Sequence, residues 1–309
     1  MWFNVEVVST TNYWVEDYGI LRPDCTRYIP PESFLGEYVS MARKNISGIS
    51  QWQVRNEKSG SDFLNFLEKE NVFVGKSYLE WWNVLYTSVN WCPWAIVWDE
   101  SVEYSLKSMD LEDTPENRNI VKRQMASDLW IDYEQLTLIP QIDFHIDMIY
   151  RPLQDGSIAV PDYVSWYEMF SKFVPDIFAN KQNYLNWLDQ MKKEAEWVLQ
   201  NAEEQLKKWW YEVKKVPSFT IPKEKYASLW LNMVQNYRFC DPIINYMNWV
   251  WWTSKDGTMY YMTNTSTFPE LDDAMKNVFI DLGIDSVCFL DTQKYLNDNW
   301  AFDCLTQEL

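Results

Sequence analysis

Residues 136–160 read LTLIPQIDFHIDMIYRPLQDGSIAV, and this stretch indicates the class of fold. The apolar run at residues 136–139 ends at a proline and predicts a short buried strand. Apolar and polar residues alternate over residues 144–150, which predicts a second strand. The turn sequence at residues 154–157 contains Asp-Gly, so residues 158–160 are expected to pair back as a hairpin.

The rest of the chain alternates between predicted helices and predicted strands. Helices are predicted over residues 61–70, from the end of a polar loop at 110–119 to about residue 130, over 181–213 and over 271–282. Further strands are predicted at residues 3–7, 247–253, 259–262 and 287–290. No simple residue-level repeat and no low-complexity linker interrupts this order, so the sequence favours one compact α/β domain.

The helix predicted at residues 181–213 has its apolar side chains on one face and charged side chains on or beside the other. This pattern is typical of a long surface helix that packs on its own domain. A coiled-coil arm that binds a partner is the alternative.

The chain is acidic, with 45 Asp and Glu residues against 27 Lys and Arg residues and a net charge of −18. An acidic surface repels phosphate groups, which disfavours binding to nucleic acid or to a membrane surface. Cationic ligands would be attracted to it. The 19 Trp residues need extensive burial, so most are expected in the core, and a few remain available to stack on a planar ligand.

The five cysteines are Cys25, Cys92, Cys240, Cys288 and Cys304. Their odd number and wide spacing do not indicate a disulfide framework, and a chain with one histidine is a poor candidate for ordinary zinc chemistry. We expect Cys92, Cys240 and Cys288 to be packed as small hydrophobic residues. The N-terminus lacks a signal-peptide pattern and no apolar run is long enough to span a bilayer, so a cytoplasmic location is expected.

Three short segments together resemble one protein family. Residues 10–20 contain Trp-x-x-Asp-x-Gly, residues 141–150 contain His-x-Asp, and residues 302–309 contain a cysteine followed by Leu-Thr. In order and separation these segments resemble the guanidino-group-modifying superfamily, particularly the agmatine deiminases and the peptidylarginine deiminases. The resemblance implies the pentein fold, an α/β propeller of five ββαβ modules, as a single catalytic domain over residues 1–309 with a helical insertion at about 179–215. Because few residues precede the first motif, one module is expected to be short, rearranged or missing.

The resemblance also assigns roles to five residues. Cys304 would be the nucleophile and His145 the general acid and base. Asp17 and Asp147 would bind the guanidinium, and Trp14 would line the pocket. These residue types suit the reaction, because two carboxylates accept the N–H groups of a planar cation while a thiolate attacks its central carbon. His145 would protonate the departing ammonia and then activate the water that hydrolyses the thiouronium intermediate, and no metal or organic cofactor is implied.

Several functions stay open within this interpretation. The substrate would be a small cationic guanidino compound, such as free arginine or agmatine, or an arginyl peptide. An amidinotransferase of the same fold would resolve the Cys304 adduct with an amine in place of water, and a non-catalytic guanidinium-binding or interaction protein would keep only the fold. An amino-acid carboxylate on the substrate would require an arginine, and the candidates are Arg22, Arg27, Arg55 and Arg151. The oligomeric state is open.

Overall fold

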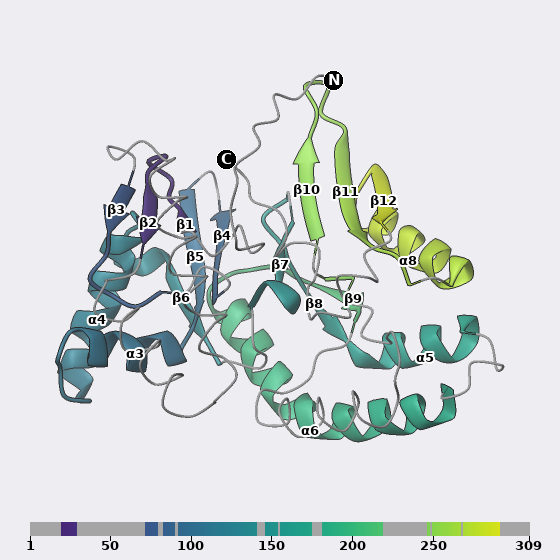
Figure 1. The fold of residues 1–309 in the computed structure, drawn as a ribbon, viewed down its shortest axis with the longest axis horizontal. Coiled ribbons are helices and arrows are strands. Elements are labelled where there is room, and N and C mark those ends of the chain that lie inside the picture. The colour runs from purple at the N-terminus through teal and green to yellow at the C-terminus, as the bar shows by residue number, and fades with distance from the viewer. Residues whose placement is uncertain are drawn as a thin grey trace, which may run out of the picture. The chain divides into compact units, whose positions relative to one another are not determined.

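The structure is a computed structural model that describes residues 20–29, 72–79, 83–89, 92–140, 146–153, 155–174, 181–218, 246–247, 249–266 and 268–290 (Figure 1). The strand predicted at residues 3–7 and the helix predicted at residues 61–70 lie outside these ranges. The chain divides into two compact units. The first unit comprises Met1–Trp81, Ser101–Leu136 and Gln307–Leu309, and the second comprises Trp82–Glu100 and Thr137–Thr306.

The described residues form a mixed α/β fold with four three-stranded sheets. The strands are β1 (Ile20–Leu21), β2 (Arg27–Ile29) and β3 (Val72–Val74) in one sheet, β4 (Val84–Val89), β5 (Cys92–Trp98) and β6 (Leu136–Ile139) in the next, β7 (Arg151–Pro152), β8 (Ile158–Asp162) and β9 (Val213–Pro217) in the third, and β10 (Trp249–Thr253), β11 (Met259–Asn264) and β12 (Ser286–Leu290) in the fourth. The helices are α3 (Glu100–Ser108), α4 (Pro115–Asp128), α5 (Tyr163–Phe173), α6 (Lys181–Lys208) and α8 (Pro269–Asp281), with 3-10 turns η4 (Tyr133–Gln135) and η5 (Ile146–Met148).

The sheets share one order of connection. In the sheets β1-β2-β3, β7-β8-β9 and β10-β11-β12, the first strand is antiparallel to the middle strand and the third is parallel to it. In the remaining sheet β4 is antiparallel to β5, and β6 is the other neighbour of β5. A parallel pair needs a crossover, which α5 and α6 provide between β8 and β9 and α8 provides between β11 and β12. Strand, strand, helix and strand therefore recur along the chain.

Three hairpin turns repeat the same hydrogen bonds, at residues 22–26, 153–157 and 254–258. In each turn the first N–H donates to the fifth carbonyl at 2.8–2.9 Å, and the fourth N–H donates to the first carbonyl at 2.9 Å. The third residue is an aspartate whose carboxylate accepts the fifth N–H at 2.9–3.2 Å. The fourth residue has a left-handed φ, which is 63° at Cys25, 82° at Gly156 and 89° at Gly257. Glycine adopts this conformation without strain, whereas a residue with a side chain such as Cys25 rarely does. The three turns thus repeat one backbone geometry, with an aspartate in the third position and Ser or Thr in the fifth.

Several helices end in one motif, in which a left-handed residue follows the last turn and the next N–H donates five residues back. The left-handed residues are Asp110 after α3, Trp130 after α4, Trp210 after α6 and Gly283 after α8. At the end of α6 the Tyr211 N–H donates to the Leu206 carbonyl at 3.2 Å. This reversal ends the long helix at Lys208 and lets Val213 begin β9, so the predicted helix end at residue 213 is wrong.

Other predicted elements are confirmed with small shifts of boundary. These are β6, β8, the hairpin of β10 and β11, α8 and β12. The polar loop is shorter than predicted, because α4 already begins at Pro115. Thr114 caps this helix by accepting the Asn117 N–H at 3.2 Å, and proline suits the first helical position.

In the first unit, both α3 and α4 are held to the segment after β3 by side-chain hydrogen bonds. The carboxylate of Asp128 accepts the N–H groups of Lys76 and Ser77 at 2.9 and 2.7 Å. Ser105 Oγ accepts the Tyr78 N–H at 2.8 Å. The hydrogen bonds to Ser77 and Tyr78 satisfy buried backbone donors, and all three bonds hold α3 and α4 to the segment after β3.

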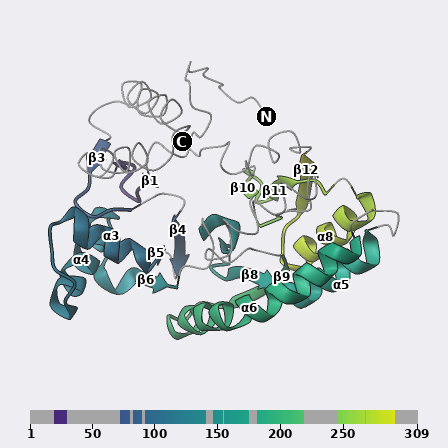
Figure 2. The same ribbon diagram turned by 60° about the horizontal axis from the view of Figure 1, so that its bottom comes forward.

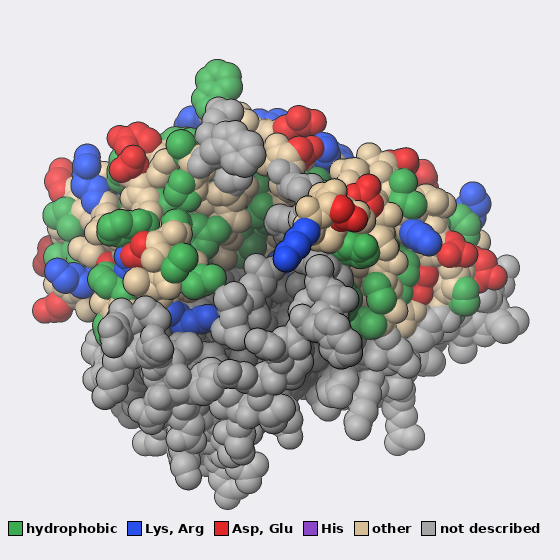
Figure 3. All heavy atoms as spheres, turned by 90° about the horizontal axis from the view of Figure 1, so that it is seen from above, with side chains coloured by type: hydrophobic (Ala, Val, Ile, Leu, Met, Phe, Trp, Pro, Cys, Tyr) green, Lys and Arg blue, Asp and Glu red, His purple; other side chains and the backbone are tan. Residues whose placement is uncertain are grey.

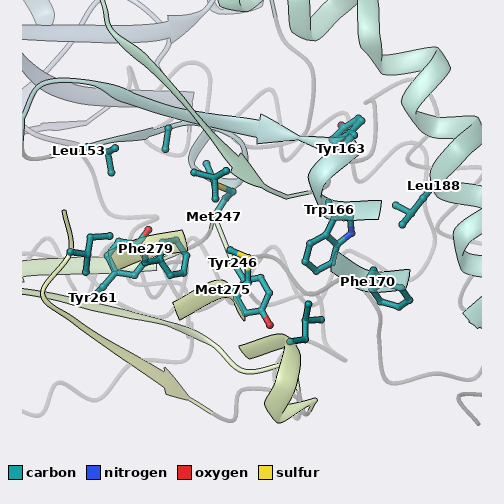
Figure 4. Close-up of a cluster of buried hydrophobic side chains, with 14 of the residues drawn as sticks. Leu153, Tyr163, Trp166, Phe170, Leu188, Tyr246, Met247, Tyr261, Met275 and Phe279 are labelled. Atoms are coloured by element: carbon teal, nitrogen blue, oxygen red, sulfur yellow. The ribbon is translucent and has the colours of Figure 1, made fainter. Parts of the chain in front are cut away.

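In the second unit, aromatic side chains from separate elements fill the larger core (Figure 4). Trp166 of α5 lies 5.9 Å from the ring of Tyr246, and Tyr261 of β11 lies 4.7 Å from the ring of Phe279 in α8. Helix α5 packs against both α6 and α8 (Figure 2). Burial of these rings is the main stabilising contribution expected for this unit.

Candidate active site

Of the five residues that the sequence assigned to catalysis and substrate binding, the structure describes Asp147. Trp14, Asp17, His145 and Cys304 lie outside the described residues.

Asp147 lies in the 3-10 turn η5, not on a strand. The N–H groups of Ile149 and Tyr150 both donate to the Ile146 carbonyl, at 3.1 and 2.9 Å. Ile146, Ile149 and Tyr150 are all buried, and residues three and four positions apart lie on the same face of a helical turn. An extended strand would have directed Ile149 to the face opposite Ile146. The strand predicted at residues 144–150 is therefore wrong over residues 146–150, where the hydrogen bonds to the Ile146 carbonyl form a turn.

The carboxylate of Asp147 is held by an arginine of the same chain. Asp147 is 4% exposed, and its Oδ2 lies 3.5 Å from Nη2 of Arg151, which is 9% exposed. Nε of Arg151 donates to the Met247 carbonyl at 3.0 Å. Removing one partner of a buried ion pair of this kind costs about 3–5 kcal/mol. At the position predicted to bind a substrate guanidinium, the carboxylate thus already faces a guanidinium.

The turn that contains Met247 is fixed by the residue before it. Tyr246 Oη donates to Asp272 Oδ1 at 2.5 Å, and the same carboxylate accepts the Ser266 N–H at 2.8 Å and the hydroxyl of Thr265. Burial and the charge of Asp272 raise the pKa of Tyr246 well above its ordinary value, so its hydroxyl stays a donor. Hydrogen bonds therefore fix both the pair Asp147–Arg151 and the turn at residues 246–247.

Tyr150, which follows the turn of Asp147, is a second buried hydroxyl group in this region. Its ring packs edge to face on Trp98 of β5, with ring centroids 5.8 Å apart. Burial raises the pKa of Tyr150 well above its ordinary value, and the nearby charge of Glu203 raises it further. Tyr150 is accordingly a neutral hydroxyl and not a candidate base at neutral pH.

In the first unit, Arg22 is also engaged by its own chain. Its guanidinium is stacked 4.1 Å from the ring centroid of Phe73 and 5.5 Å from that of Trp130. Nη2 lies 2.7 Å from Oδ2 of Asp24, and the residue is 6% exposed. Arg22 and Arg151, two of the candidates for a substrate carboxylate, therefore have internal carboxylate partners.

The described cysteines differ from the expectation. Cys25, Cys92 and Cys288 are free and exposed, so the expected burial of Cys92 and Cys288 is wrong. Cys92 is the first residue of β5, at the hairpin end, and Cys288 is on β12 at the edge of its sheet. Strand ends and edges leave side chains accessible to water even where the sequence around them is apolar. Cys240 and Cys304 lie outside the described ranges.

Among the residues that the structure describes, no group of three or more His, Cys, Asp or Glu side chains is arranged to hold a metal ion. No helix in the described ranges is long and apolar enough to cross a membrane. On the face shown in Figure 3, the described acidic, basic and hydrophobic side chains are intermixed.

No protein-family model matches this sequence, and a search of curated proteins likewise finds no match.

Proposed function

We propose that the chain is a guanidinium hydrolase, a deiminase that converts an arginine-like or agmatine-like guanidino group to a ureido group and releases ammonia. Cys304 attacks the guanidinium carbon and His145 transfers the protons. Asp17 and Asp147 bind the N–H groups of the substrate, with Trp14 beside it. Ammonia leaves from the tetrahedral adduct, and water then resolves the thiouronium intermediate to regenerate the thiol.

The observation that carries this proposal is the repeated order of strand, strand, helix and strand. The superfamily that the sequence resembles is built from ββαβ modules, and the described sheets follow that order. We propose on this basis that the fold is the five-module propeller. A fifth module would have to include residues outside the described ranges.

The chemistry of Asp147 also supports the proposal. Its carboxylate lies against the guanidinium of Arg151 in a buried environment, where charge-assisted contacts are strong. The net charge of −18 would favour the approach of a cationic substrate.

The test is ammonia release from a panel of arginine, agmatine and arginyl peptides, together with identification of the ureido product. Cys304→Ala should abolish turnover, because it removes the thiol that the proposal makes the nucleophile. Cys288→Ala, which removes an exposed free thiol on β12, is the matched control and should retain activity. No turnover by a folded wild-type protein, or full activity of Cys304→Ala, would contradict the proposal.

One observation favours a second candidate, a non-catalytic guanidinium-binding or interaction protein. The buried pair of Asp147 and Arg151 would also be kept, as a structural ion pair, by a protein that catalyses no reaction. Such a protein would bind members of the panel in a calorimeter without releasing ammonia. An amidinotransferase would instead transfer the amidino group when an amine is added, and the same product analysis detects it.

A further inference from the structure

We propose that Arg151 is the positioning residue for the Asp147 carboxylate, which it holds ionised and oriented for a guanidinium ligand. The inference rests on the proposed function in one respect, since it assumes that Asp147 contacts the substrate. Arg151 itself touches no reacting atom in this role.

The contacts of Arg151 fix it at three points. Its backbone is part of β7, where Arg151 pairs with Ala159 of β8. Its Nε donates to the Met247 carbonyl at 3.0 Å, and its Nη2 lies 3.5 Å from Oδ2 of Asp147. The planar guanidinium directs these two nitrogens in set directions, so anchoring one determines where the other lies.

These contacts distinguish a positioning residue from a mobile competitor of the substrate. A competitor must leave the carboxylate easily, and it would be expected to be exposed and held by few bonds. Arg151 is buried, and its removal would also leave the Met247 carbonyl without this donor. Arg151 therefore stays in place while a ligand binds.

The charge of Arg151 has a direct consequence for Asp147. Burial disfavours an ionised carboxylate, and an adjacent cation offsets that penalty. A protonated Asp147 would lose acceptor capacity for a guanidinium. Without Arg151, the affinity for the substrate should therefore fall more than the rate of the chemical step.

The experiment compares steady-state kinetics of the full-length wild type, Arg151→Met, Arg151→Lys and Phe279→Leu on the best substrate of the panel. We expect Arg151→Met to raise KM about tenfold or more and to lower kcat less than about threefold. Arg151→Lys keeps the positive charge but not the planar guanidinium with its two fixed N–H directions. KM of this variant should therefore lie between the values of wild type and Arg151→Met. Phe279→Leu perturbs the core between α8 and β11 in the same unit and serves as the control for destabilisation alone, with KM unchanged.

Circular dichroism establishes that each variant is folded at the assay temperature. If Arg151→Met does not fold, KM of Arg151→Lys is compared with KM of wild type. A raised KM supports the positioning role, because a purely structural arginine would leave KM unchanged in a folded Lys variant. Turnover with an unchanged KM in the folded Arg151 variants overturns this inference and leaves the proposed function intact. No turnover by wild type overturns both.

Discussion

Gly75 offers a direct test of the packing in the first unit. A Cβ atom on Gly75 would lie 1.9 Å from Cε2 of Tyr28 and 2.8 Å from two further atoms of the same ring. Ordinary contact begins at 3.4 Å, so the ring would have to move by about 1.5 Å, the difference between the two distances. Tyr28 is fully buried, and its hydroxyl donates to the Ser77 carbonyl. Gly75→Ala should therefore displace both a packed ring and a hydrogen bond.

The expected cost follows from these two effects. Overpacking of a core site costs about 1–3 kcal/mol, and a lost buried hydrogen bond costs about 1 kcal/mol. Gly75→Ala should therefore lower the free energy of unfolding by about 2–4 kcal/mol. With a urea slope of about 2 kcal/mol/M, the unfolding midpoint falls by about 1–2 M.

The assay is urea unfolding of four proteins, namely wild type, Gly75→Ala, Tyr28→Leu and the double variant. In the Tyr28→Leu background the clashing ring is absent, so Gly75→Ala should cost less than about 1 kcal/mol there. The reasoning is refuted if Gly75→Ala costs equally much in both backgrounds, or if it leaves the wild-type midpoint unchanged.

Two further predictions concern the end of α6 and the hairpin of β7 and β8. Trp210→Gly should raise the free energy of unfolding by about 1 kcal/mol, because Trp210 has a left-handed φ of 68° and a side chain that is 87% exposed; an unchanged or lower urea midpoint would count against this. Burial alone would raise the pKa of the Asp155 carboxyl, but hydrogen bonds from Lys214 and Ser157 hold that pKa below its ordinary value. A lowered pKa stabilises the fold above the unfolded pKa, and this contribution is lost as the pH falls through the folded pKa. Asp155→Asn should therefore lower the thermal midpoint at pH 7 and match wild type at about pH 2, and a difference that persists in acid would contradict this linkage.

The repeated architecture was hidden from the sequence for a physical reason. The three hairpin turns share the aspartate, the left-handed residue and a following Ser or Thr, while the strands on either side have no residue pattern in common. Cys25 stands where the other two turns have glycine, so the usual Asp-Gly signal is absent from the first turn. Backbone geometry repeats here with little repetition of residue identity.

The segment around Asp147 shows why the candidate site was only partly predictable. Residues 144–150 fit an alternating pattern, but Ile146, Ile149 and Tyr150 also fit the spacing of a helical turn. In so short a segment the two patterns coincide, and the choice depends on which residues the surrounding core buries. The family resemblance made Asp147 a candidate guanidinium ligand, and Arg151 was one of four arginines considered for a substrate carboxylate.

The sequence by itself determined the elements whose ends depend on near neighbours. The hairpin of β10 and β11 turns at Gly257 and α8 is followed by Gly283, and both glycines act within a few residues. Only the tertiary structure decided that Asp147 lies in a buried turn against Arg151, and that Arg151 reaches the Met247 carbonyl 96 residues away. Such contacts depend on which apolar faces pack together, and this is a property of the whole second unit that no local pattern of residues specifies.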